Sequence, residues 1–211
     1  MGEEEQLHMA WIGPGEHSRM IEAWGEALER KDPGTWGHCK RVAAMATILA
    51  QALGLADEEI RVIAAGALLH EIGKLAIPDA ILLKPAMLTQ EERLVMRESC
   101  SRGYEMLRNV PSLAEAAEIV YAQREKFDGT GYPRGLKGAV IPLGARIVAV
   151  ADAFEMFISD RPHQWARGFA AARREVLGWS GRELDPQIVE VALSVLDDAK
   201  VEGLFSASSM P

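Results

Sequence analysis

The chain has 211 residues, of which 48% are hydrophobic and 26% are charged, a balance typical of a globular protein. A chain of this length buries roughly 70% of the surface that it exposes when unfolded, so one well-packed domain is expected. The formal net charge of −8 opposes the nonspecific attraction to phosphate backbones on which DNA- and RNA-binding proteins rely, so neither nucleic acid is an expected partner.

The chain begins with a segment, 1–16, that contains Gly13-Pro14-Gly15 and shows no sustained hydrophobic period, so a loose leader is expected there. Its acidic start lacks the basic region and the apolar stretch of a secretory signal. No apolar run approaches the roughly 18 residues that span a bilayer. A cytoplasmic location without membrane contact is therefore expected.

Long Ala- and Leu-rich stretches, broken by glycine and proline, follow this segment and show little alternation of β-branched residues. This pattern predicts an all-α domain over 17–200, with a tail over 201–211. The hydrophobic period and the capping signals place helices at about 17–31, from Gly37 or His38 to Gly54, and at about 57–70, 89–107, 112–125, 145–158, 166–178 and 186–200. The segment 128–133 is a dense turn signal that no regular element can contain.

Only two cysteines are present, Cys39 and Cys100, and they are far apart and form no CxxC motif. Neither a disulfide framework nor a thiolate zinc site is indicated by this spacing. Both cysteines are expected to be free thiols.

His70 and Glu71 lie side by side in an apolar run at the expected end of a helix. Burying either side chain costs on the order of several kcal/mol unless a polar group or a metal ion compensates. A neutral His nitrogen and a carboxylate oxygen are both ligands for Zn, Mn or Fe, so a metal site is one interpretation. A hydrogen-bonded core histidine beside a solvated glutamate is the other, and the pair alone favours neither.

Asp152 lies inside another apolar helix, where an isolated carboxylate is again costly. His38 lies near the start of an amphipathic helix. Taken singly, each of these residues is more often structural than functional. Together with the His70-Glu71 pair, they would converge from three helices on one candidate metal site.

The order of His38, His70-Glu71, Gly73-Lys74 and Asp152 resembles the HD superfamily of metal-dependent phosphohydrolases, with Glu71 where that family has Asp. Six further segments, in order and at plausible spacing, resemble its HD-GYP branch; they are 77–85, 88–92, 128–133, 141–147, 151–162 and 184–186. The resemblance covers about 20–195.

This resemblance implies an all-α, HD-domain-like helical bundle of the HD-GYP type around a metal centre. In active members it implies hydrolysis of the bacterial messenger cyclic di-GMP by a hydroxide that bridges two metals. It also implies that Lys74 contacts phosphate and that Arg161 lies near the ligand. Without the resemblance, the Lys74 charge could simply interact favourably with the negative end of a helix dipole, and Arg161 could form an ordinary surface ion pair.

Three positions that hold histidine in the family differ in this chain, namely Ser99, Gln123 and Arg124. A basic residue that usually follows Arg-Pro-Tyr is also absent, because Arg161-Pro162 is followed by His163-Gln164. The donors that remain, His38, His70, Glu71 and Asp152, correspond to the ligand set of a single-metal site. Either no metal or one divalent ion (Mn, Fe, Mg or Zn) is therefore expected, and a two-metal centre is not.

Arg124 places a permanent cation at a position where the resemblance implies a metal ligand. One hypothesis is that its guanidinium turns inward and pairs with Glu71 or Asp152 in a metal-free polar network. The alternative is that it points to solvent beside an empty metal site.

Two functions follow from these observations, and whether the chain is an enzyme stays open between them. The first is a degenerate HD-GYP domain, impaired in cyclic di-GMP hydrolysis, that binds cyclic di-GMP or a related nucleotide or a partner protein in second-messenger signalling. Its contact loop would be Gly131, Tyr132 and Pro133, and the resemblance implies a diguanylate-cyclase-type partner. The same loop could instead be a turn that stabilises the fold. The second function is a residual phosphodiesterase that uses one metal.

Overall fold

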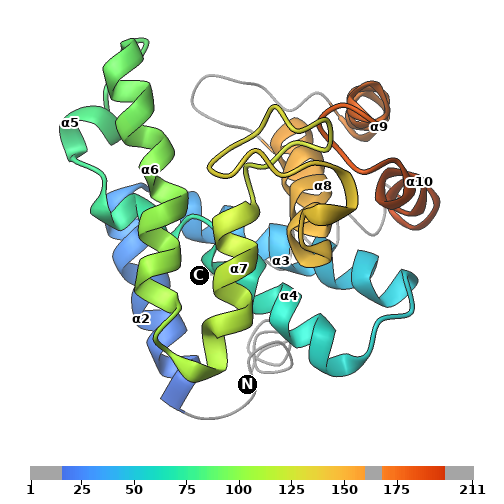
Figure 1. The fold of residues 1–211 in the computed structure, drawn as a ribbon, viewed down its shortest axis with the longest axis horizontal. Helices are drawn as coiled ribbons and strands as arrows, with labels where there is room; N and C mark the ends of the chain where they lie inside the picture. The colour runs from blue at the N-terminus through green and yellow to red at the C-terminus, as the bar shows by residue number, and fades with distance from the viewer. Residues whose placement is uncertain (1–15, 160–167, 198–211) are drawn as a thin grey trace.

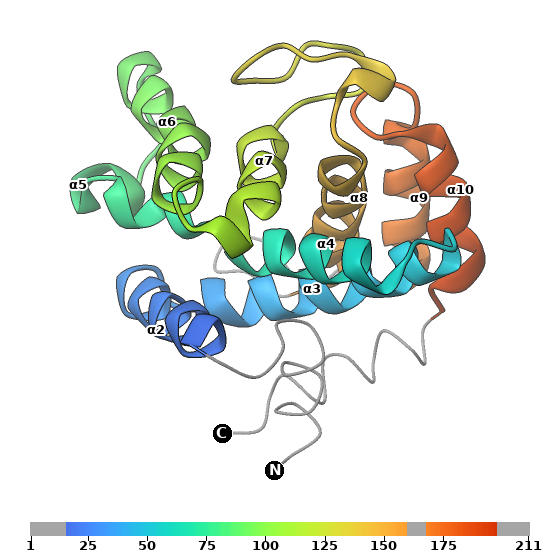
Figure 2. The same cartoon turned by 60° about the horizontal axis from the view of Figure 1, so that its bottom comes forward.

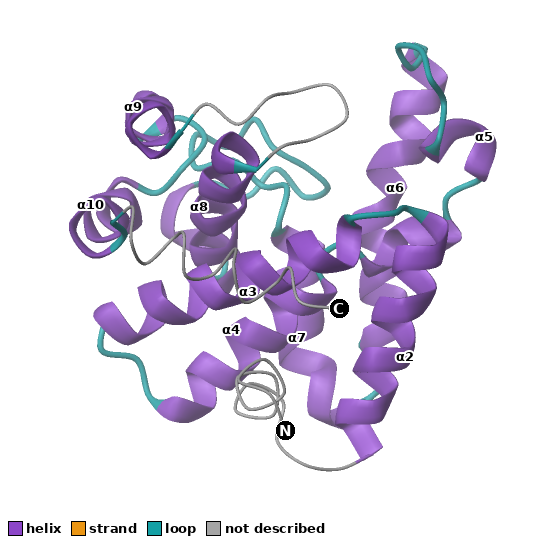
Figure 3. Cartoon of the chain, turned by 180° about the vertical axis from the view of Figure 1, so that it is seen from behind, coloured by secondary structure: helices purple, strands orange, loops and turns teal. Residues whose placement is uncertain are grey.

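The computed structural model describes residues 16–159 and 168–197, and these residues form helices and loops without a β-strand (Figure 3). The all-α prediction is confirmed. The α-helices are α2 (Glu16–Lys31), α3 (Thr35–Ala52), α4 (Asp57–Leu69), α5 (Asp79–Leu82), α6 (Gln90–Leu107), α7 (Ala114–Ala122), α8 (Leu143–Ile158), α9 (Phe169–Trp179) and α10 (Pro186–Val195). Short 3-10 helices are η1 (Ile72–Ala76), η2 (Pro111–Leu113) and η3 (Gly138–Val140).

The helices form two levels. In Figure 2, α2 and α3 lie along the base, whereas α6, α7 and α8 stand upright above them. α3 packs against α4 and α8, and α6 packs against both η1 and α7 (Figure 1). The segment after α7 arches over the upper ends of α7 and α8.

One hydrophobic core joins these helices. Its largest fully buried side chains are Phe154, Ile21, Leu28, Met45, Leu49, Leu68, Leu69, Ile72, Ile77, Leu107, Ile147 and Ile188. α8 is central to this core because it is apolar around most of its circumference, which is typical of a buried helix. This burial explains why polar residues on α8 must find partners inside the protein.

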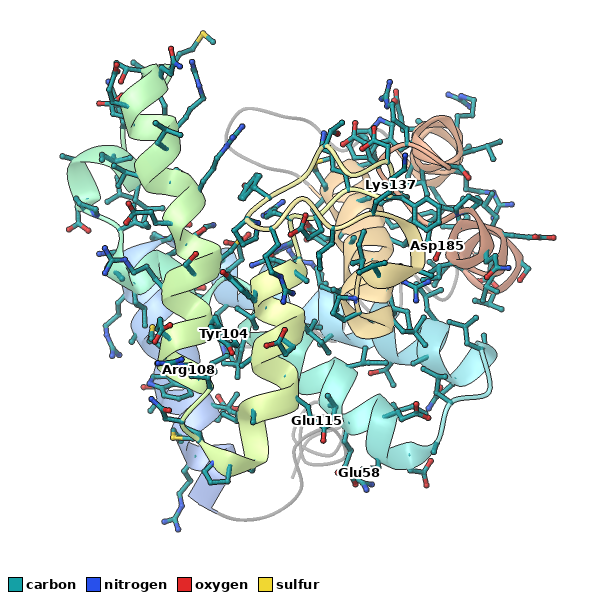
Figure 4. All side chains as sticks on the ribbon, in the orientation of Figure 1. Glu58, Tyr104, Arg108, Glu115, Lys137 and Asp185 are labelled. Atoms are coloured by element: carbon teal, nitrogen blue, oxygen red, sulfur yellow. The ribbon has the colours of Figure 1, made fainter. Side chains whose placement is uncertain are left out.

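A stacked aromatic pair connects α6 to α7. Tyr104 and Tyr121 have ring centroids 4.7 Å apart, and the guanidinium of Arg108 lies 5.9 Å over the ring of Tyr104. Figure 4 shows Tyr104 between the two helices, with Arg108 one turn further along the chain, just past the end of α6. Such stacking stabilises the fold by about 1 kcal/mol beyond what burial of the two rings contributes.

α3 begins earlier than predicted, at Thr35, because its cap comes from the preceding helix. The Glu29 carboxylate on α2 accepts hydrogen bonds from the backbone N–H groups of Gly34 (2.7 Å) and Trp36 (2.9 Å). Gly34 adopts a left-handed conformation, with φ of 89°. No side chain next to Thr35 in the sequence caps this helix, so the predicted start of the helix, at Gly37 or His38, was too late.

The last helix ends earlier than predicted, at Val195 and not near residue 200. Leu196 adopts an extended conformation and is buried. The guanidinium of Arg173, on α9, donates to the carbonyl of Leu193 at 2.7 Å, which satisfies one of the acceptors that a helix end leaves without an intrahelical partner. Residues 198–200, the tail over 201–211 and nearly all of the leader over 1–16 lie outside the described residues.

Gly73 allows η1 to approach α6 very closely. A Cβ atom at this position would overlap the carbonyl oxygen of Ser99 and crowd the backbone nitrogen of Gly103. The chain therefore needs glycine here in order to place the turn after Glu71 against α6.

We expect Gly73→Ala to lower the free energy of unfolding by at least about 2 kcal/mol, because the added methyl group meets backbone that cannot move aside. Gly178→Ala is the matched control, since nothing lies within 4 Å of its Cβ position on α9, and it should change stability by less than about 1 kcal/mol. Urea unfolding followed by circular dichroism measures both variants. Equal stability of the two would contradict the close approach.

Candidate functional site

Four predicted ligand residues meet where α3, α4 and α8 converge. His38 Nε2, on α3, lies 3.2 Å from His70 Nε2 and 3.3 Å from Asp152 Oδ1, on α8. His70 and Glu71 were expected in the last turn of α4, but the helix ends at Leu69 and the pair forms the turn that leads into η1. His38, His70 and Glu71 each offer one ligand atom within 4.8 Å of the others.

Hydrogen bonds on the far side of each ring orient the two histidines. His70 Nδ1 lies 2.6 Å from the carbonyl oxygen of Ala67, which can only accept, so Nδ1 carries the proton and donates it. His38 Nδ1 likewise faces Glu155 Oε2 at 2.7 Å. Both Nε2 atoms therefore point into the site, an arrangement that also orients metal-bound histidines.

Glu155 is a site residue that the sequence reasoning missed. It is fully buried on α8, one turn after Asp152, and its Oε1 atom accepts hydrogen bonds from Arg41 Nη2 (2.6 Å) and Ser159 Oγ (2.5 Å). Its other oxygen holds His38. A second lone carboxylate in an apolar helix was the signal that could have identified it.

Arg124 turns inward, as hypothesised, and contacts both carboxylates. Its Nη2 donates to Glu71 Oε1 at 2.7 Å, and its Nη1 lies 3.4 Å from Asp152 Oδ2. Arg124 follows the end of α7, whereas Glu71 follows α4 and Asp152 lies on α8. One guanidinium thus joins three elements, and the alternative that it points away into solvent is wrong.

Lys74 lies on the other side of Glu71. Its Nζ atom is 2.9 Å from Asp32 Oδ2 and 3.4 Å from Glu71 Oε2, and its side chain is about three-quarters buried. Lys74 therefore belongs to the same charge network. The phosphate contact expected from the resemblance stays a prediction.

The pKa values of the two histidines are shifted in opposite directions. Burial disfavours a charged His38, but its hydrogen bonds to Asp152 and Glu155 outweigh burial and raise its pKa to about 9. Burial lowers the pKa of His70, despite the nearby Glu71. His38 is therefore the protonated ring of the pair, and His70 Nε2 accepts.

The carboxylates of the site stay ionised. Burial would raise the pKa of Glu71, but Lys74 and Arg124 lower it to about 2. The pKa of Asp152 is also held well below its usual range, because His38 and Arg124 outweigh burial. The pKa of Arg124 is raised, since the two carboxylates outweigh its own burial. Cations and anions thus alternate through this network.

Gln123 and Ser99, the other two positions where the resemblance implies histidine, lie against the turn that follows α4 and against η1. The Gln123 side-chain amide donates to the backbone carbonyl of His70, so it holds the end of α4. The backbone of Ser99 forms the close contact with Gly73. Next to Ser99, Cys100 is a buried free thiol, like Cys39, as predicted, and burial raises the pKa of Cys100 to about 11.

The predicted contact loop lies beside Arg124. The backbone N–H of Tyr132 donates to the Arg124 carbonyl at 3.1 Å, and the Arg97 guanidinium lies 4.9 Å over the Tyr132 ring. The buried Glu125 carboxylate accepts the backbone N–H groups of Arg134 (2.8 Å) and Leu136 (3.0 Å), which ties down the segment after Gly131-Tyr132-Pro133. Arg161, the other predicted ligand contact, lies outside the described residues.

Membrane contact was not expected from the sequence. Within residues 16–159 and 168–197, each helix is either too short or too polar to cross a bilayer.

Comparisons with known proteins identify the family of this chain. The family model of the HD domain matches residues 22–188. The chain is 43% identical over 169 residues to a cyclic di-GMP phosphodiesterase response regulator of Xanthomonas campestris, covering 79% of this chain and 45% of that protein. It is 40% identical over 178 residues to a cyclic di-GMP phosphodiesterase of Thermotoga maritima, and the match covers 83% of this chain and 48% of that protein. The chain thus spans about half the length of these curated relatives.

A solved structure of a cyclic GMP-AMP-specific phosphodiesterase from Vibrio cholerae has a similar fold, with a TM-score of 0.65 and 20% sequence identity. The likeness covers 91% of this chain and 53% of that one. It confirms the prediction of an HD-like helical bundle.

We expect Glu155→Gln to lower the free energy of unfolding by about 3 kcal/mol, because it breaks the buried ion pair between Glu155 and Arg41. Glu118→Gln is the matched control, since it removes only the partly exposed ion pair with Arg134 at 3.1 Å and should cost less than about 1 kcal/mol. Urea unfolding of both variants tests this, and similar costs would show that Glu155 is not a central contact.

Proposed function

This chain belongs to the HD domain family and to its HD-GYP branch, and we propose that it binds cyclic di-GMP or a related nucleotide without efficiently hydrolysing it. One observation carries the proposal, the guanidinium of Arg124 between Glu71 and Asp152 at 2.7 and 3.4 Å. An arginine cannot lose its charge, so it remains a cation where the family chemistry uses metal ions. Hydroxide formation between two metals then has no place in this site.

The donors that remain suit one divalent ion at most. His38, His70 and Glu71 offer nitrogen and oxygen atoms of the kind that Mn, Fe, Mg or Zn bind, with Asp152 beside them. Such an ion, when bound, would supply Lewis-acid activation of a water molecule. It would also have to compete with Arg124 for the carboxylates. Gln123 would not serve a second ion in this orientation, because its amide is turned to the His70 carbonyl.

The nucleotide part of the proposal is supported by the relatives, which are named as cyclic di-GMP phosphodiesterases. We assign phosphate contact to Lys74 and, by family resemblance, to Arg161. Lys74 is held by Asp32 and Glu71, so a phosphate would have to displace part of this network. The proposed domain spans 17–200 in the cytoplasm, with a diguanylate-cyclase-type domain as the proposed partner of the Gly131-Tyr132-Pro133 loop.

A second candidate function is a residual phosphodiesterase with one metal. The observation that favours it is the cluster of His38, His70 and Glu71, whose ligand atoms lie within 4.8 Å of one another. Their far-side hydrogen bonds to Ala67 and Glu155 match those that orient metal-bound histidines. The two functions differ in whether an ion or Arg124 neutralises the carboxylates.

We expect Arg124→Ala to make folding stability depend on metal, because removing the guanidinium takes away the cation that Glu71 and Asp152 share, and Lys74 and His38 each contact only one of the two carboxylates. Added Mn²⁺ should then raise the midpoint of thermal unfolding, as a ligand at about 100 times its dissociation constant adds about 2.7 kcal/mol. The wild type and the control Arg134→Ala should respond much less.

Elemental analysis of the purified wild type accompanies this experiment. Two equivalents of iron or manganese per chain, or an equal Mn²⁺ response in wild type and Arg124→Ala, would contradict the role given to Arg124.

We expect the wild type to show no Mn- or Fe-dependent hydrolysis of cyclic di-GMP above that of His70→Ala. The triple variant Ser99→His, Gln123→His, Arg124→His should bind more metal and hydrolyse the nucleotide, because it restores three imidazole donors. Product formation is measured by chromatography. Turnover by the wild type that is abolished in His70→Ala would instead establish the single-metal phosphodiesterase.

A further inference from the structure

An arm formed by residues 78–99 projects from the body of the molecule. It comprises α5, the loop that follows and the first half of α6. In Figure 1 and, from behind, in Figure 3, α5 and the upper end of α6 stand clear of α7 and α8. No residue of this arm is fully buried, and none of its apolar side chains belongs to the hydrophobic core. The arm is therefore an extension with most of its surface in solvent.

Exposed apolar side chains are concentrated on this arm. Five large apolar side chains are exposed within residues 16–159 and 168–197. Three of the five lie on the arm, namely Leu83, Met87 and Leu94, which are 51%, 89% and 58% exposed. Apolar groups gathered in one part of a surface are typical of a contact site. The arm is therefore suited to a protein partner.

Polar contacts hold the arm in one conformation. Lys84 Nζ lies 2.7 Å from a carboxylate oxygen of Glu92, and Thr89 caps the start of α6. At the base of the arm, Lys31 Nζ on α2 lies 2.9 Å from Asp79 Oδ1. A surface that is already ordered loses little conformational entropy when it binds a partner.

Leu94 lies at the centre of the outward face of α6. Residues three apart are neighbours on a helix surface, so Glu91 and Arg97 flank Leu94 on either side along the helix. All three side chains are exposed, and the buried side chains of α6 lie on the opposite face. This face therefore presents an acidic, an apolar and a basic group in order along the helix.

The two flanking charges can pair with another molecule. Within residues 16–159 and 168–197, neither Glu91 nor Arg97 forms an ion pair; the Glu91 carboxylate accepts the Thr89 hydroxyl at 2.9 Å, and the Arg97 guanidinium lies over the Tyr132 ring. A guanidinium over a ring face still presents N–H donors at its edge. Both groups thus suit a partner that brings the opposite charge to each.

We propose that α6 of this arm pairs antiparallel with α6 of a second copy of the chain, across a two-fold axis at Leu94. Such an axis brings the same surface of both copies together. The two Leu94 side chains then meet, and Glu91 of each copy faces Arg97 of the other, because both lie three residues from the axis. A parallel pairing would place like charges opposite each other, so the charges select the antiparallel order.

This arrangement also covers the tip of each arm. Leu83 and Met87 precede Leu94 in the chain, so in antiparallel order they lie beside the part of the partner's α6 that follows its own Leu94. The contact involves one helix and one loop from each copy, which places it among small interfaces and makes the dimer reversible. The inference does not depend on the nucleotide or the metal content proposed for the candidate site.

Sedimentation equilibrium of the full chain, from low micromolar to near-millimolar concentration, tests the proposal. We expect the wild type to dimerise reversibly. Glu91→Arg and Arg97→Glu should each weaken the dimer on the order of tenfold or more, because either change places like charges opposite each other at both symmetric contacts. The double variant should recover most of the affinity, since it restores both pairs in reverse order. Leu94→Ser should weaken the dimer without disturbing the core.

The matched controls are Glu58→Arg and Arg61→Glu, which change the net charge by the same amounts. These residues form an exposed ion pair three residues apart on α4. Figure 4 shows Glu58 at the end of the molecule away from the arm. Both control variants should dimerise as the wild type does.

Three results would overturn the proposal. The first is a wild type that stays monomeric at the highest concentration. The second is a dimer that Leu94→Ser and both single charge reversals leave intact, which would place the contact elsewhere. The third is a loss of affinity in the single variants of Glu91 and Arg97 that the double variant does not recover. Circular dichroism of each variant shows that a loss of affinity is not a loss of fold.

Discussion

The bridge from Arg124 to Glu71 and Asp152 is the interaction on which the rest of the site depends. Two carboxylates in an apolar interior repel each other and lose hydration, so the fold requires a cation between them. Here the guanidinium supplies it, at 2.7 and 3.4 Å. Glu71 follows α4, Arg124 follows α7 and Asp152 lies on α8. The contact that neutralises the carboxylates therefore also ties these three helices together.

The surrounding contacts retain the form of a metal site. Glu155 and the Ala67 carbonyl each hold one ring nitrogen of His38 and His70, so both remaining nitrogens face inward, 3.2 Å apart. A proton on His38 makes this approach favourable, because one nitrogen then donates to the other. The site is therefore organised by a proton and a guanidinium, while its ligand geometry still suits one ion. That balance underlies the two functions proposed above, binding without efficient hydrolysis and a residual single-metal activity.

Arg124 also connects this site with the segment that follows it. Its carbonyl oxygen holds Tyr132, and the carboxylate of its neighbour Glu125 holds the backbone of Arg134 and Leu136. Tyr132 therefore lies beside the charge network, because its backbone is bound to Arg124.

The sequence by itself determined the helical class and most helix positions, because hydrophobic period, glycine and proline act locally. It also singled out four residues that meet at the candidate site, because an isolated charge in an apolar helix requires a partner. The sequence also indicated that Arg124 could replace an ion. Only the tertiary structure decided that it contacts both carboxylates, that Glu155 holds His38, and that Glu29 starts α3 from the preceding helix. These contacts join residues far apart in the chain or in different elements, so they depend on how the helices pack, which no local pattern specifies.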